Sequence, residues 1–77
     1  MKFTSQELKE IMFKYNISNV ELEHYSGYNK RYISGLRNDK YPITDSFKVA
    51  LMNYLSQKKK LDIMEAAKLV RLGGSYE

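Results

Sequence analysis

The sequence of 77 residues contains no cysteine, no tryptophan, one proline and one histidine. Without cysteine the chain can form neither a disulfide nor a thiolate metal site, and a lone histidine can complete neither a zinc cluster nor a Cys–His catalytic pair. The acidic residues show no spacing typical of a catalytic dyad. We therefore expect a protein that is not an enzyme, that needs no metal or cofactor, and that is stabilised by core packing or by self-association.

Long apolar runs are also absent. The longest, Val49-Ala50-Leu51-Met52, has four residues, whereas a membrane span needs ~20. The N-terminal residues lack the apolar stretch of a secretory signal, and the lack of cysteine is typical of a reducing compartment. The sequence therefore predicts a cytoplasmic protein without membrane association, and its length predicts a single domain over residues 1–77.

Positive charge is concentrated in the middle of the chain. Residues 1–27 carry a net charge of −1, residues 28–60 carry +6, and residues 61–77 carry −1. Lysine and arginine gain free energy by displacing counterions from phosphates, so such a block indicates a surface that faces a polyanion. On charge alone, a solvated basic surface is an equally good interpretation.

Helix start signals recur along the chain. Residues 4–7 and 18–21 have the form of capping boxes, and residues 62–65 supply a third acidic-ended cap at Asp62. Asn29 is expected as an N-cap, and a further helix is expected to begin at Thr44 or Asp45. Apolar residues then recur with helical spacing, and no segment alternates with period two. We predict an all-α fold, a compact bundle of about five helices, whose last helix covers about residues 62–72 and is closed by Gly73-Gly74.

The helix expected after Asn29 has two different faces. Ile33 and Leu36 lie on its core side, and the opposite arc is polar, with Lys30, Arg31, Ser34, Arg37 and Asn38. Arginine can donate two hydrogen bonds to guanine and asparagine can pair with adenine in the major groove. Two short helices joined by a turn at Gly27 predict a helix-turn-helix over about residues 18–38, although an exposed helix that is merely basic is an alternative.

Residues 19–38, NVELEHYSGYNKRYISGLRN, resemble the helix-turn-helix of the phage repressor and Cro-like family of transcription regulators. Leu22 stands at the first core position, Gly27 at the turn, and residues 4–56 as a whole are similar to the family. The resemblance implies a lambda-repressor-like domain that binds double-stranded DNA. Two residues depart from the family pattern: Glu23 replaces its common alanine, and we expect this side chain to bend outward into water; Asp39 stands near its common glycine.

The resemblance also implies which residues contact DNA. Asn19 is expected to meet a phosphate at a helix N-terminus. Lys40, Tyr41 and the run 58–60 are weaker phosphate candidates, for which solvated loop positions are the more ordinary interpretation. The base-reading places of the family fall on Asn29, Lys30, Arg31, Ser34, Arg37 and Asn38.

The function implied is that of a repressor or modulator of transcription, of phage or mobile-element type, associated with the nucleoid in the bacterial cytoplasm. Apolar residues surround most of the helix expected at 62–72, which predicts a homodimer through that helix and a palindromic operator. A monomer with a buried last helix is the alternative. A second possible function is a protein-binding module on the same scaffold, such as an antirepressor or an inhibitor of a host nuclease or other partner protein.

Overall fold

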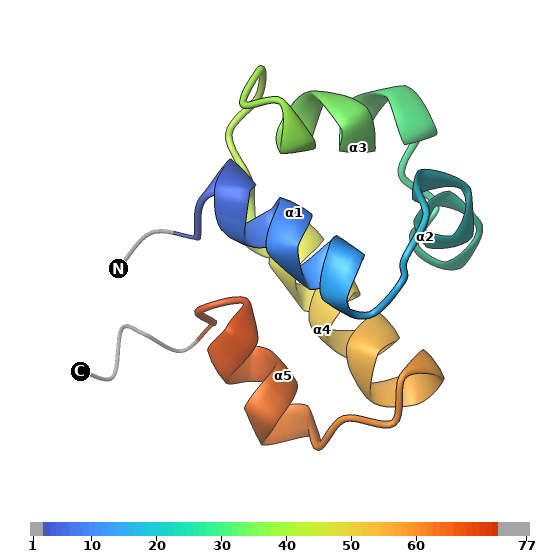
Figure 1. Cartoon of the computed structure of the whole chain (residues 1–77), viewed down its shortest axis with the longest axis vertical. Coiled ribbons are helices and arrows are strands. Elements are labelled where there is room, and N and C mark those ends of the chain that lie inside the picture. Colours follow the sequence, from blue (N-terminus) through green and yellow to red (C-terminus); the bar gives the residue numbers. More distant parts are fainter. Residues whose placement is uncertain (1–2, 73–77) are drawn as a thin grey trace.

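The computed structural model describes residues 3–72, which form five helices and no strand. α3 lies at one end of the molecule and the connection between α4 and α5 lies at the other (Figure 1). The prediction of a compact, all-α globule of five helices is confirmed. The helices are α1 (Ser5–Lys14), α2 (Asn19–Ser26), α3 (Lys30–Arg37), α4 (Asp45–Lys58) and α5 (Ile63–Leu69).

Each helix begins where the sequence predicts a helix start, and Thr44 is the N-cap of the helix predicted to begin at Thr44 or Asp45. Thr4 and Ser18 form complete capping boxes with Glu7 and Glu21, in which the hydroxyl accepts from the backbone three residues on and the glutamate accepts from the cap's own N–H. Such caps satisfy backbone N–H groups that have no acceptor within the helix. The remaining N-caps are Asn29, Thr44 and Asp62, and each side chain accepts a backbone hydrogen bond from the helix that it starts.

The helix ends use left-handed residues, and only α2 uses glycine for this, at Gly27 with φ +83°. α1, α3 and α5 are followed by Asn16, Asp39 and Arg71, with φ of +56°, +61° and +59°. After Arg71 the chain turns back, and the N–H of Leu72 donates to the carbonyl of Ala67 over 2.9 Å. This Schellman arrangement satisfies the last carbonyl groups of a helix. α5 therefore ends at Leu69, earlier than predicted, and the expected stop at Gly73-Gly74 lies outside the described residues.

The core is one cluster of apolar side chains to which all five helices contribute. Its fully buried side chains come from every helix; the largest are Leu8, Met12, Leu22, Ile33, Leu36, Phe47, Leu51, Leu55 and Val70. α5 packs on α4 through buried Ala66 and Val70, with Leu69 half-buried. Ile63 and Met64, at the start of α5, stay exposed. The free apolar surface of α5 is therefore smaller than its sequence indicates, because one face of the helix is used against α4.

None of the helices in this part of the chain is long and apolar enough to cross a membrane.

Candidate nucleic-acid interface

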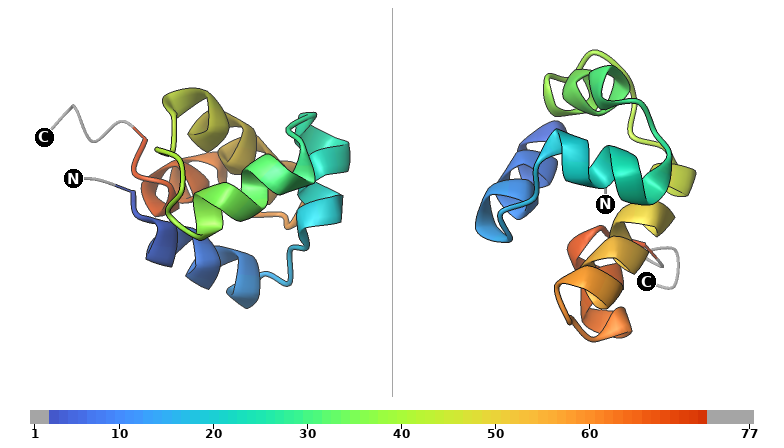
Figure 2. Two further views of the ribbon diagram at one scale, coloured as in Figure 1. Left: turned by 90° about the horizontal axis from the view of Figure 1, so that it is seen from above. Right: turned by 90° about the vertical axis from the view of Figure 1, so that its right-hand side faces the viewer.

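α3 is the outermost helix at its end of the molecule and crosses in front of the other helices when seen from that end (Figures 1 and 2). Ile33 and Leu36 are fully buried beneath it. On its outward face Lys30, Arg31 and the following Asn38 are exposed, and Ser34 is half-buried. The core face and the polar face of this helix are thus as the sequence predicts, and α3 itself carries no acidic residue.

Two side chains fix the beginning of α3. Asn29 Oδ1 accepts from the backbone N–H of Arg31 over 2.7 Å. Glu23 Oε2, from α2, accepts from the backbone N–H of Lys30 over 3.0 Å. This hydrogen bond is exposed, so Glu23 stays at the surface and also caps α3, a contact that the sequence did not indicate. Its carboxylate turns to the N-terminus of α3, where free N–H groups and the positive end of the helix dipole favour a negative charge.

The end of α3 is joined to the beginning of α2. Arg37 Nη1 donates to Asn19 Oδ1 over 2.9 Å, and both residues are half-buried. The side chains of Lys30 and Arg31, in contrast, make no hydrogen bond or ion pair with another residue of the described part of the chain. The predicted contact residues therefore fall into two groups. Lys30 and Arg31, at the start of α3, have no such partner among the described residues, whereas Arg37, at the end of α3, is held by Asn19 of α2.

The end of α3 is also closed by its own backbone. Asp39 adopts the left-handed conformation, and the N–H of Lys40 donates to the carbonyl of Gly35 over 2.8 Å. Asp and Asn tolerate this region better than other residues with a side chain, so Asp39 takes the role of the glycine that is common in the resembled family. Ser5 Oγ lies 2.7 Å from the carbonyl oxygen of Leu36 and adds a link from α1.

A row of aromatic rings flanks α3. The rings of Phe47, Tyr28, Tyr32 and Tyr41 follow one another at centroid distances of 5.5, 5.6 and 5.6 Å. A Cβ atom at Gly35 would collide with the ring of Tyr41. Tyr41, which the sequence suggests as a phosphate contact, thus holds the loop after α3 against the helix, with 47% of its surface exposed. A small residue six positions before a tyrosine was the only sequence signal for this contact.

The basic block of residues 28–60 is divided in space. Lys40 lies in the loop that follows α3, but the run 58–60 lies at the end of α4, on the other side of α2 from α3 (Figure 2). The structure therefore does not bring these lysines together with the α3 face. It brings Lys58 and Lys59 together instead with Val20, His24 and Tyr25 of α2, a cluster that sequence patterns did not indicate.

Several acidic side chains are engaged within the fold. Hydrogen bonds from Arg71 and from the Thr4 backbone hold the pKa of Glu7 below its usual value. A hydrogen bond from the Ser18 backbone and another from Tyr54 lower the pKa of Glu21 in the same way. No group of three acidic, histidine or cysteine side chains in residues 3–72 is arranged to hold a metal ion.

No protein-family model matches the chain, and comparisons with curated proteins and with solved structures find no match either.

Proposed function

We propose that the protein binds double-stranded DNA sequence-specifically and regulates transcription, as a helix-turn-helix domain of the phage repressor and Cro-like type. In this proposal α2 and α3 are the two helices of the motif, the residues between them, with Gly27, are its turn, and α3 enters the major groove. A helix of eight residues is about 12 Å long and fits within this groove.

The observation that carries the proposal is the outward face of α3. It is exposed at one end of the molecule, it presents Lys30 and Arg31 without internal partners among the described residues, and its opposite side is anchored by Ile33 and Leu36. A rigid helix with free cationic donors is what reading of base edges requires.

The contacts are assigned from the restraints on each side chain. Lys30 and Arg31 are proposed to reach bases, with Ser34 and Asn38 further along the same face. Arg37 is proposed to hold a backbone phosphate together with Asn19, rather than to read a base, because the hydrogen bond of 2.9 Å fixes it against the start of α2. Asn29 is proposed to contribute through its amide nitrogen, since its oxygen caps α3.

The experiment begins with selection of bound sequences from a random duplex library, followed by anisotropy titrations at several salt concentrations. Arg31→Ala should cost about 1 to 3 kcal/mol and relax the preference at one base pair. Arg37→Ala should weaken all duplexes alike and reduce the salt slope by about 1. Lys68→Ala, on the exposed surface of α5, is the matched control. The proposal fails if no sequence is enriched, or if Arg31→Ala and Lys68→Ala bind equally well.

We also propose that the protein forms a symmetric dimer through the first turn of α5, where Ile63 and Met64 are 44% and 69% exposed. Two recognition helices about 34 Å apart would then read a palindromic operator. Sedimentation equilibrium should show a dimer that Met64→Lys converts to a monomer. A wild-type protein that is monomeric at every concentration on DNA and off it would refute the dimer.

A further inference from the structure

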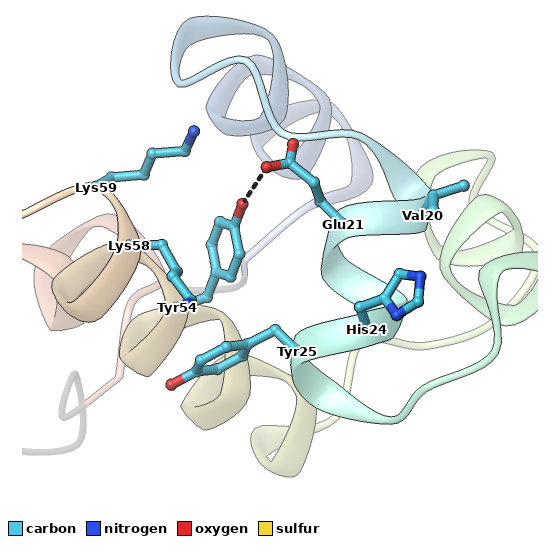
Figure 3. Close-up of a pocket in the computed structure, with 7 residues that line it drawn as sticks. All are labelled: Val20, Glu21, His24, Tyr25, Tyr54, Lys58 and Lys59. Atoms are coloured by element: carbon cyan, nitrogen blue, oxygen red, sulfur yellow. Dashed lines mark hydrogen bonds between the residues drawn. The ribbon is translucent and has the colours of Figure 1, made fainter.

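A groove of about 570 Å³ lies between α2 and the end of α4, away from the α3 face. Val20, His24 and Tyr25 line it from α2, and Lys58 and Lys59 line it from α4 (Figure 3). Val20, His24 and Lys58 are exposed, so the groove is open to solvent along its rim. Its volume is within the range of about 300 to 1,000 Å³ that is usual for binding pockets.

The charge of the groove is positive. Lys58 makes no ion pair with another described residue. The acidic residue of the wall is Glu21, and its carboxylate already accepts from the Ser18 N–H over 3.3 Å and from the Tyr54 hydroxyl over 3.2 Å. Lys59 also lies near this carboxylate and lowers its pKa. A ligand with negative charge would therefore be attracted by Lys58 first, and would meet few competing carboxylates.

The floor of the groove is apolar and preformed. The rings of Tyr25 and Tyr54 meet edge to face at a centroid distance of 5.3 Å, and the Tyr25 hydroxyl donates to Gln57 over 2.8 Å. Tyr54 is 2% exposed, whereas Val20, which lines the groove from the N-terminal end of α2, presents 48% of its surface. A groove that is lined by an exposed valine and by anchored rings suits an apolar side chain of a partner, which gains free energy by removing that surface from water.

The same details argue against a nucleic acid in this groove. Bases bind to single-strand sites by stacking on exposed aromatic faces. Here the tyrosine rings are used against each other and their hydroxyl groups are hydrogen-bonded. α2 also lies between the groove and α3, so a duplex held by α3 is on the other side of that helix (Figure 2).

We propose that this groove binds an acidic segment of a partner protein, with an apolar side chain of the segment against Val20 and Tyr25 and its carboxylates paired with Lys58 and Lys59. The interaction is independent of DNA binding by α3. It would give the protein two separate binding surfaces, one on each side of α2.

The test uses the full chain, labelled with ¹⁵N, and a short blocked peptide of glutamates around one phenylalanine. A peptide with glutamine in place of every glutamate is the ligand control. Amide shifts are expected at Val20, His24, Tyr25, Lys58 and Lys59, with no comparable shifts for the glutamine peptide. Lys58→Gln combined with Lys59→Gln should weaken binding at least about tenfold. Lys30→Gln combined with Arg31→Gln removes the same charge from α3 and should change it little.

Val20→Asp is a second variant, which should abolish peptide binding through the apolar wall while the selected duplex still binds. The proposal is overturned if the groove amides do not shift at up to about 1 mM peptide. It is also overturned if both double variants weaken the peptide equally, or if single-stranded oligothymidine shifts the groove amides more than the peptide does. Duplex affinity, measured on the same variants, reports on the α3 proposal separately.

Discussion

The α3 face and the lysine end of α4 are both basic, but they are built differently. At α3 the charged side chains stand on a helix whose start is held by Glu23 and whose end is held by Asn19 through Arg37. At the end of α4, Lys58 and Lys59 border an apolar groove against α2. Basic residues that are close in sequence therefore need not form one interface, because α2 separates α3 from the run 58–60 of the same basic block.

The position of α3 is fixed by the core beneath the helix, where Ile33 and Leu36 are fully buried. Leu36→Ala should lower the free energy of unfolding by about 2 to 5 kcal/mol, since Leu36 is fully buried and truncation leaves a cavity. Phe13→Ala, in α1 at a residue that is 89% exposed, should change it by less than about 0.5 kcal/mol. Urea denaturation monitored by circular dichroism measures both. Equal effects would mean that α3 is not the more tightly packed element.

Glu23 caps α3 and places a negative charge beside its basic face, whereas Lys58, at the lysine end of α4, makes no ion pair with another described residue. Glu23→Ala should cost about 0.5 to 2 kcal/mol of stability, because the Lys30 N–H loses its acceptor. The same change should raise DNA affinity at low salt, since a negative charge next to the α3 face is removed. Urea denaturation and anisotropy titrations measure the two effects. Glu10→Ala, at an exposed position of α1, should do neither.

The pair Glu7–Arg71, which joins α1 to α5, gives a smaller and pH-dependent effect. The pKa of Glu7 is lower in the folded protein than its usual 4.5, so its contribution to stability is present above that pH and is lost as pH falls through the folded pKa. Glu7→Gln should cost on the order of 1 kcal/mol at neutral pH, because the pair is partly exposed to solvent. Urea denaturation of both proteins at neutral and acid pH should show this difference disappear below the folded pKa; a difference that persists there would contradict the assignment.

Sequence patterns predicted the features that depend on near neighbours. The capping boxes at Thr4 and Ser18, the turn at Gly27 and the two faces of α3 all involve residues a few positions apart. These local hydrogen bonds and periodicities are set by helix geometry, so residue types at fixed spacings in the sequence are sufficient to predict them.

Contacts between separate helices could not be predicted in this way. The bond from Arg37 to Asn19 joins residues 18 positions apart, and the turn of Glu23 toward Lys30 depends on where α3 begins relative to α2. Asp39 and Arg71 adopt the left-handed conformation at helix ends where glycine is expected. The backbone hydrogen bonds that close these ends, from Lys40 to Gly35 and from Leu72 to Ala67, offset the cost of this conformation for a residue with a side chain. α5 is shorter than predicted because the left-handed Arg71 ends it before Gly73-Gly74 is reached.

The central claim is that the α3 face, and not the lysine end of α4, binds DNA. It is tested most directly by the affinity for the selected duplex of Arg31→Ala compared with Lys58→Ala, two variants that each remove one exposed positive charge. Arg31→Ala should weaken binding about 5- to 150-fold, and Lys58→Ala should stay within about twofold of the wild type. An equal loss for the two variants, or a larger loss for Lys58→Ala, would contradict it.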